Sequence, residues 1–134
     1  MIGGRVLDTI AIYGFIRRSP YIEAVVWSSV EDHIVLVVPI PALAAALAQI
    51  PEHDRDIVDV LLRDVPVTIT TGDLTAQTAA GLADTLRPAG GAAPAALTAA
   101  SVVHAAKTRG WPVLTSEPYP LRALWPDIAI EPMP

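Results

Sequence analysis

Two short polar segments carry the residue types that could support metal or hydrolytic chemistry. Asp8 and Thr9 follow an apolar run near the start of the chain, and Thr115 and Glu117 follow another near its end. Carboxylates of this kind hold Mg²⁺ in proteins, together with the phosphates of a substrate. The structural alternative is that Asp8 caps a helix and Glu117 is a solvated loop acid. The metal interpretation requires a fold that brings the two segments together.

The pattern of the chain predicts strands that alternate with helices. Solid apolar runs mark the strands, and apolar residues at spacings of three and four mark the helices. This alternation is typical of a parallel sheet that helices cover on both faces. We expect strands at 1–7, 34–38, 67–70, 111–114 and 128–130, and helices at 10–17, 21–30, 42–50, 54–63, 74–86, 95–108 and 118–124, with a loop at 90–94.

The predicted architecture is therefore a three-layer α/β/α domain with a central parallel sheet of four to five strands, and we take their order to be about 3-2-1-4-5. Its 134 residues are expected to form a single domain, 1–134. Ligands of an open parallel sheet bind beyond the carboxyl ends of the strands, near the point where the strand order reverses. With this order the first and fourth strands are neighbours, so Asp8 and Glu117 are expected to face one crevice.

Composition limits the classes of protein that the chain can belong to. Hydrophobic residues make up 52% and charged residues 17%, with no cysteine, which excludes a disordered chain and a disulfide scaffold. The net charge is −5, so the protein has no overall basic field to attract nucleic acid. Any RNA contact is expected to be local. The large apolar fraction favours a surface that a partner covers.

The segment 34–51 is the one candidate for a membrane span, because it carries no formal charge. Pro39 and Pro41 divide this segment, so a buried strand that leads into a helix is the better interpretation. The order of charges at the N-terminus is the reverse of a secretory signal, since Arg17 and Arg18 follow the first apolar run. We expect a cytoplasmic protein with no membrane partner.

The two terminal regions resemble the PIN domain family, the fold of the ribonuclease toxins in bacterial type II toxin–antitoxin pairs. Residues 2–16, with Val-Leu-Asp-Thr at 6–9, look like the opening strand of that family. Residues 101–132, with Gly-Trp-Pro-Val-Leu-Thr at 110–115, are similar to its final helix, strand and acidic turn. The order of the segments and the total length agree as well, so the resemblance covers essentially the whole chain.

This resemblance implies a site in which three or four acids hold Mg²⁺ or Mn²⁺, and the metal activates water for phosphodiester hydrolysis. Asp8 matches the first acid, and Glu117 matches the last in conservative form. Both are candidate metal ligands and catalytic residues, with Thr9 or Thr115 orienting metal-bound water. The second and third acids are expected at 44–46 and 98–100. Alanine and threonine stand there instead.

Two missing acids change the expected function. Two carboxylates bind one Mg²⁺ or Mn²⁺ loosely, and the alternative is that no metal binds. Asp73 is the nearest other acid by topology, although a helix cap is the better interpretation of that residue. We expect a PIN-like domain with weak or lost endoribonuclease activity. The alternatives are a catalytically silent module that binds protein or RNA, and a binder of small molecules or phosphate in the same crevice.

The resemblance also bears on partners. PIN-like toxins commonly pair, and surplus apolar surface is normally covered by a partner, so we expect a homodimer. A small antitoxin protein and RNA are the other partners that the resemblance implies.

Some residues have simple structural interpretations that compete with functional ones. His104 is better explained as a packed helical side chain than as a catalytic base. Arg17 and Arg18 favour a solvated helix end over a phosphate contact. The tryptophans at 27, 111 and 125 are better explained as core or interface anchors than as base-stacking platforms.

Overall fold

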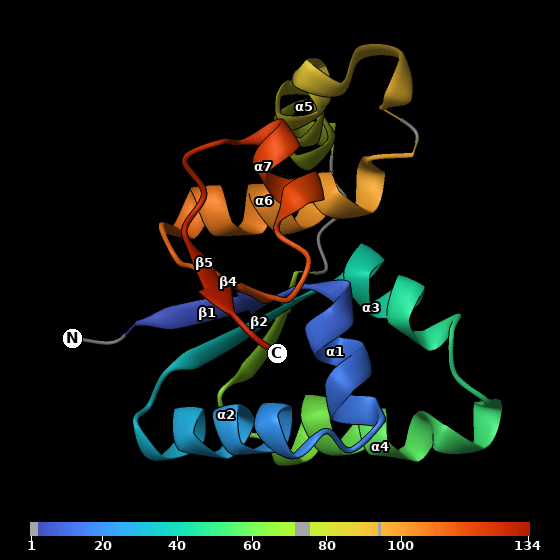
Figure 1. Ribbon diagram of the computed structural model, residues 1–134, viewed down its shortest axis with the longest axis vertical. Helices are drawn as coiled ribbons and strands as arrows, with labels where there is room; N and C mark the ends of the chain where they lie inside the picture. The colour runs from blue at the N-terminus through green and yellow to red at the C-terminus, as the bar shows by residue number, and fades with distance from the viewer. Residues whose placement is uncertain (1–2, 72–75, 94) are drawn as a thin grey trace.

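A computed structural model describes residues 3–71, 76–93 and 95–134 (Figure 1). A five-stranded, all-parallel sheet with the strand order β3-β2-β1-β4-β5 forms its centre, which confirms the predicted order. The strands are β1 (Gly4–Leu7), β2 (Val35–Pro39), β3 (Thr68–Thr71), β4 (Val113–Thr115) and β5 (Ile130–Pro132).

Helices cover both faces of the sheet, as predicted for a three-layer α/β/α fold. In Figure 1, α5, α6 and α7 lie on one side of the sheet, and α1, α2 and α4 lie on the other. Helix α3 follows β2 and contacts both α1 and α6. The helices are α1 (Thr9–Ile16), α2 (Pro20–Glu31), α3 (Ile40–Leu47), α4 (Asp56–Asp59), α5 (Ala76–Leu86), α6 (Leu97–Arg109) and α7 (Tyr119–Leu124), joined by short turns η1 (Glu52–Arg55), η2 (Val60–Asp64) and η3 (Arg87–Ala92).

The core lies on both faces of the three central strands. Val6, Leu7, Leu36, Val113 and Leu114 are completely buried, as expected for strands that helices cover on both sides. The charge-free segment 34–51 forms β2 and α3. No helix among the described residues is long and apolar enough to cross a membrane.

The register between β1 and β4 determines where the polar segments lie. Leu7 pairs with Leu114, and the N–H of Asp8 bonds to the carbonyl of Leu114 at 3.3 Å. Asp8 and Thr115 therefore leave the sheet side by side at its carboxyl edge. The reversal of strand order places the start of α1 and the turn after β4 around the same point.

Two predicted segments differ in the structure. The segment predicted as a helix at 54–63 is helical but is not one uniform α-helix, because η1, α4 and η2 succeed one another there as 3-10, α and π turns. The loop predicted at 90–94 is wrong in part, since η3 continues the chain after α5 as a 3-10 turn up to Ala92, and residue 94 lies outside the described part. Gly90 adopts a φ of 54° within η3, a conformation that glycine permits without a steric penalty.

Smaller differences concern the ends of elements. Helix α3 begins at Ile40, two residues earlier than predicted, because Pro41 stands in its first turn, where no backbone N–H donor is needed. β5 begins at Ile130, since Ile128 is still held in a turn by a bond from its N–H to the carbonyl of Trp125. Gly110 ends α6 in the left-handed conformation, as predicted. The first residues of the strand predicted at 1–7 and of the helix predicted at 74–86 lie outside the described part.

Candidate functional site

The structure brings Asp8 and Glu117 to the same crevice, a cavity of about 310 Å³ at the carboxyl edge of β1 and β4. The end of β1, the turn after β4 and the first turns of α1, α6 and α7 form its walls. Polar and apolar side chains form the rest of its lining, from Thr9, Ile10, Tyr13, Gln49, Ala95, Thr98, Ala99, Pro120 and Leu121. We call this cavity the Asp8–Glu117 crevice.

Asp8 has a structural role whether or not it has a chemical one. It is the N-cap of α1, and its Oδ1 accepts a hydrogen bond of 2.8 Å from the N–H of Thr9. Its Oδ2 accepts a second hydrogen bond, of 2.7 Å, from Oγ1 of Thr115. The predicted helix cap is therefore present, and each carboxylate oxygen already has one protein donor.

Thr115 connects the two acids. Its side chain is buried, with 1% exposure, and its Oγ1 also accepts a hydrogen bond of 2.9 Å from the N–H of Glu117. Asp8, Thr115 and the backbone of Glu117 thus form one continuous chain of hydrogen bonds. These hydrogen bonds fix the turn after β4 and hold the backbone of Glu117 beside the crevice. The Glu117 side chain is exposed.

The surroundings of Asp8 in the crevice favour the protonated form of its carboxyl group. Burial raises the pKa of the Asp8 carboxyl, the hydrogen bonds from Thr115 and Thr9 lower it, and the charge of Glu117 raises it again. The net direction is upward from the ordinary value of 3.8. A cation in the crevice would offset the repulsion between the two carboxylates.

The two sets of positions expected to carry the missing acids differ in whether they line the crevice. Ala44, Ala45 and Ala46 do not line the crevice; the side chain on this wall belongs to Gln49, whose Nε2 donates to the carbonyl of Ala45 at 3.0 Å. Thr98 and Ala99 do line the crevice, whereas Ala100 is buried in the core.

Two polar lining residues, Tyr13 and Gln49, are not among those that the sequence predicts for the site. Tyr13 lies one helical turn after Thr9 on α1, so the spacing of four could have placed it on the same face. Gln49 comes just beyond the end of α3, where no periodic signal marks it.

The residues present fall short of the metal centre that the family resemblance implies. Within the described parts of the chain, no group of three or more histidines or acids lies close enough together to hold a metal ion. Asp73, the remaining acid considered from the sequence, lies outside the described residues. Asp8 and Glu117 supply two carboxylates, and one of these is already bonded to two protein donors. This set does not fit a four-acid, two-metal site.

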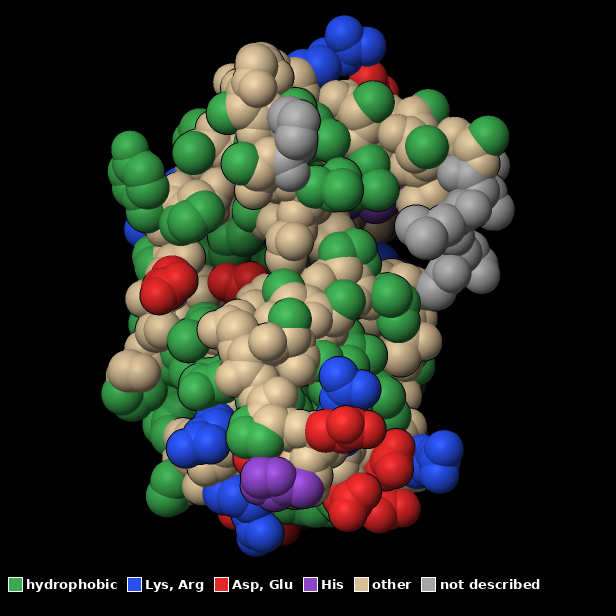
Figure 2. All heavy atoms as spheres, turned by 90° about the vertical axis from the view of Figure 1, so that its right-hand side faces the viewer, with side chains coloured by type: hydrophobic (Ala, Val, Ile, Leu, Met, Phe, Trp, Pro, Cys, Tyr) green, Lys and Arg blue, Asp and Glu red, His purple; other side chains and the backbone are tan. Residues whose placement is uncertain are grey.

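The basic residues after the first helix, Arg17 and Arg18, do not line the crevice and lie near acids. Nη1 of Arg17 lies 3.9 Å from Oδ2 of Asp54, and Nε of Arg18 bonds to Glu23 at 2.9 Å. Figure 2 shows charged side chains of both signs gathered at the lower end of one face, acidic groups at the left of its middle, and hydrophobic and neutral groups over most of the rest of the middle. On the described part of this face, the cations stand among acids and form no continuous basic patch.

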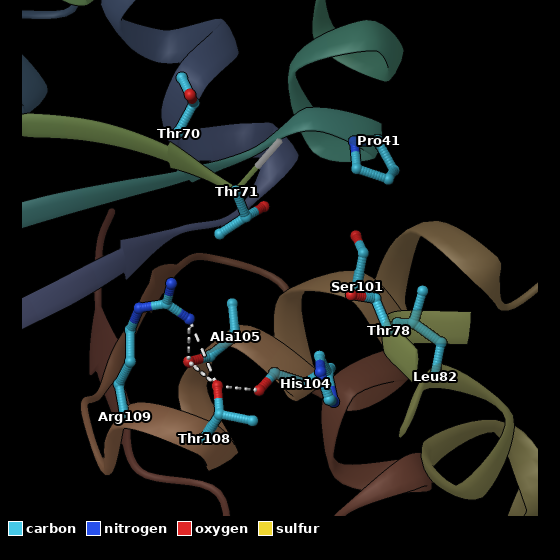
Figure 3. A pocket seen from close by; sticks show the side chains of 10 residues that line it. All are labelled: Pro41, Thr70, Thr71, Thr78, Leu82, Ser101, His104, Ala105, Thr108 and Arg109. Atoms are coloured by element: carbon cyan, nitrogen blue, oxygen red, sulfur yellow. Dashed lines mark hydrogen bonds between the residues drawn. The ribbon is translucent and has the colours of Figure 1, made fainter. Parts of the chain in front are cut away.

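The tryptophans have packing roles or are exposed. Trp111 lies directly over Gly4, and Nζ of Lys107 lies 5.6 Å from the centre of the Trp125 ring. Trp27 is 43% exposed on α2, apart from the lining of the crevice. His104 is half-buried in α6 and lines a different cavity (Figure 3).

Comparisons of the chain with family models, with curated proteins and with solved structures found no match.

Proposed function

We propose that this chain is a PIN-like domain, related to the metal-dependent endoribonuclease toxins, in which RNA cleavage is weak or lost. Three features support the relationship. The sheet has the strand order 3-2-1-4-5, the acids Asp8 and Glu117 follow its first and fourth strands, and the terminal segments resemble the family's sequence pattern.

The loss of activity rests on the chemistry of the crevice. Hydrolysis of a phosphodiester needs an activated water and enough positive charge to stabilise the transition state. The crevice offers Asp8, whose two oxygens each accept a protein hydrogen bond, and Glu117, with Ala99 and Thr98 on the wall where a third acid is expected. Two carboxylates hold at most one Mg²⁺ or Mn²⁺ loosely.

A catalytically silent interaction module is the second candidate, and exposed apolar side chains next to the crevice favour it. Tyr119 is 83% exposed and precedes Pro120, which lines the crevice. Leu97 is 47% exposed and precedes Thr98, which also lines the crevice. Large apolar groups beside a concave site are typical of contacts with another protein. On this proposal the partner is a second copy of the chain or a small antitoxin protein.

The direct test is cleavage of a mixed-sequence RNA by the purified protein with Mn²⁺, compared with the variant Asp8→Asn, Glu117→Gln. We expect the wild-type rate to lie within about tenfold of that of the double variant. Rapid metal-dependent cleavage that the two substitutions abolish would contradict the proposal. Thermal unfolding of both proteins shows that the variant is folded.

A further inference from the structure

A second cavity, also of about 310 Å³, lies at the carboxyl end of β3, between α3, α5 and α6 (Figure 3). It shares no lining residue with the Asp8–Glu117 crevice. Five of its described lining residues carry hydroxyl groups: Thr70, Thr71, Thr78, Ser101 and Thr108. An imidazole and a guanidinium complete the polar lining, and no carboxylate is among the described lining side chains. We call this cavity the Ser101–Arg109 pocket.

Arg109 is the cation of this pocket. Its Nη1 donates to the carbonyl of Ala105 at 3.2 Å and to Oγ1 of Thr108 at 3.3 Å, and these contacts hold the side chain against α6. In Figure 3 the guanidinium rises from the end of α6 toward the strand that carries Thr71. No acid among the described residues pairs with it, although the protein has a net charge of −5. A guanidinium that pairs with none of the described acids and lies beside a group of hydroxyls is suited to bind an anion.

His104 is held in place by a close approach between two helices. A Cβ atom on Gly81 of α5 would lie 2.7 Å from Cε1 of the His104 ring, so the ring occupies space that only glycine leaves open. Neither ring nitrogen bonds to a described protein group. The imidazole therefore presents one donor and one acceptor, or two donors when protonated.

The hydroxyl groups add further acceptors and donors. Ser101 is 6% exposed, and its Oγ donates to the carbonyl of Thr98 at 2.6 Å, which leaves its oxygen lone pairs available as acceptors. The hydroxyl of Thr71 enters the pocket from the opposite wall, at the end of β3 (Figure 3). Leu82 and Pro41 supply apolar surface between these groups.

We propose that the Ser101–Arg109 pocket binds a small phosphorylated polyol of about the size of a pentose phosphate. Arg109 binds the phosphate, since a guanidinium matches two phosphate oxygens at once. Ser101, Thr71 and His104 bond to the hydroxyl groups of the ligand, because each can accept or donate. The volume is at the lower end of the range for small-molecule sites. The position beyond the carboxyl end of a parallel strand is where such folds bind ligands.

A single strand of nucleic acid is a poorer match to the same lining. Such strands bind along grooves with several cations and with aromatic rings on which bases stack. The described lining has one arginine and no phenylalanine, tyrosine or tryptophan. The proposed ligand site is a different pocket from the Asp8–Glu117 crevice. A test of this proposal is therefore independent of a test of the proposed function.

The test is calorimetric titration of the full chain with ribose 5-phosphate. We expect saturable binding that Arg109→Gln weakens at least tenfold, about the contribution of a charge-assisted phosphate contact. Arg63→Gln is the matched control, because Arg63 is also exposed at the end of a helical segment and lines neither cavity. Absence of binding at about 10 mM, or equal weakening by both variants, would overturn the proposal.

Two further titrants separate the parts of the ligand. Ribose 5-phosphate is expected to bind more tightly than both inorganic phosphate and ribose. If inorganic phosphate binds as tightly as ribose 5-phosphate, the pocket does not recognise the polyol. If ribose binds as tightly as ribose 5-phosphate, Arg109 does not bind the phosphate. Backbone amide resonances locate the site: those of Thr71, Ser101 and His104 are expected to shift, and shifts confined to Asp8 and Glu117 would place the ligand in the wrong cavity.

Discussion

Oγ1 of Thr115 donates a hydrogen bond of 2.7 Å to Oδ2 of Asp8, although 107 positions of sequence separate the two residues. The same oxygen accepts a hydrogen bond from the N–H of Glu117. One hydroxyl thus joins the cap of α1 to the turn after β4. It also places one donor on a carboxylate that a metal centre would need as a ligand.

The first prediction concerns this hydroxyl. Thr115→Val keeps the shape of the side chain but leaves a half-buried carboxylate oxygen and a backbone N–H without their partner. We expect a loss of about 1–3 kcal/mol in the free energy of unfolding, measured by urea denaturation. Thr115→Ser retains the hydroxyl and is the control. A valine variant as stable as the serine variant would show that the hydrogen bonds contribute nothing.

The second prediction concerns the pH dependence of stability. Burial raises the pKa of Asp8 above its ordinary value of 3.8, so the folded protein retains this proton to a higher pH than the unfolded chain does. The resulting stabilisation is fully present below the ordinary value and is lost as the pH rises through the raised pKa. Asp8→Asn removes this titration. We therefore expect the unfolding temperature of the wild type to fall relative to that of the variant as the pH rises from about 3 to about 7.

Thermal unfolding at a series of pH values measures this difference. Asp59→Asn removes an exposed acid from α4 and serves as the control for net charge. If the Asp8→Asn and wild-type curves run parallel across the series, the raised pKa is refuted.

The third prediction concerns the packing of the first strand. A Cβ atom on Gly4 would clash with the Trp111 ring, whereas one on Gly3 would meet nothing within 4 Å. Gly4→Ala is therefore expected to lower the free energy of unfolding by about 1–3 kcal/mol, the usual cost of overpacking. Gly3→Ala is the matched control and should change stability by less than about 0.5 kcal/mol. Denaturant unfolding measures the free energy of unfolding of both variants. Equal values would contradict the close contact between Gly4 and Trp111.

The fourth prediction restores an acid to the crevice. Ala99 lines its wall at a position where the family resemblance implies a third ligand. Ala99→Asp is expected to tighten Mn²⁺ binding at least tenfold, because a third carboxylate joins the two present. Ala80→Asp, at an exposed position of α5, adds the same charge elsewhere and is the control. Equal tightening by both variants would show that net charge, rather than the crevice, governs binding.

A parallel sheet between two layers of helices could be predicted from the sequence because most of its strands and helices carry local signals, whereas the strand order had to be assumed. Apolar strands between helical patterns require a parallel sheet covered on both faces, and the carboxyl ends of β1 and β4 then bring Asp8 and Glu117 together. The hydrogen bond from Thr115 to Asp8 depends on the register of Leu7 with Leu114, which the apolar pattern alone does not specify.

Other features depend on packing that no local pattern reveals. Ile57, Val58, Leu61 and Leu62 have helical spacing, yet the backbone around them changes from 3-10 to α to π turns. The approach of His104 to Gly81 depends on how α5 packs against α6, so the Ser101–Arg109 pocket could not be found from the sequence. Whether Asp8 and Glu117 hold a metal stays a prediction.

Calorimetric titration of the wild-type protein and Asp8→Asn with Mn²⁺ tests the proposed loss of the metal centre most directly. We predict that the wild type shows no saturation below about 1 mM Mn²⁺, because two carboxylates supply too few ligands. Asp8→Asn should then differ little from it. Micromolar binding of two Mn²⁺ per chain that Asp8→Asn abolishes would contradict this and would indicate an intact nuclease centre.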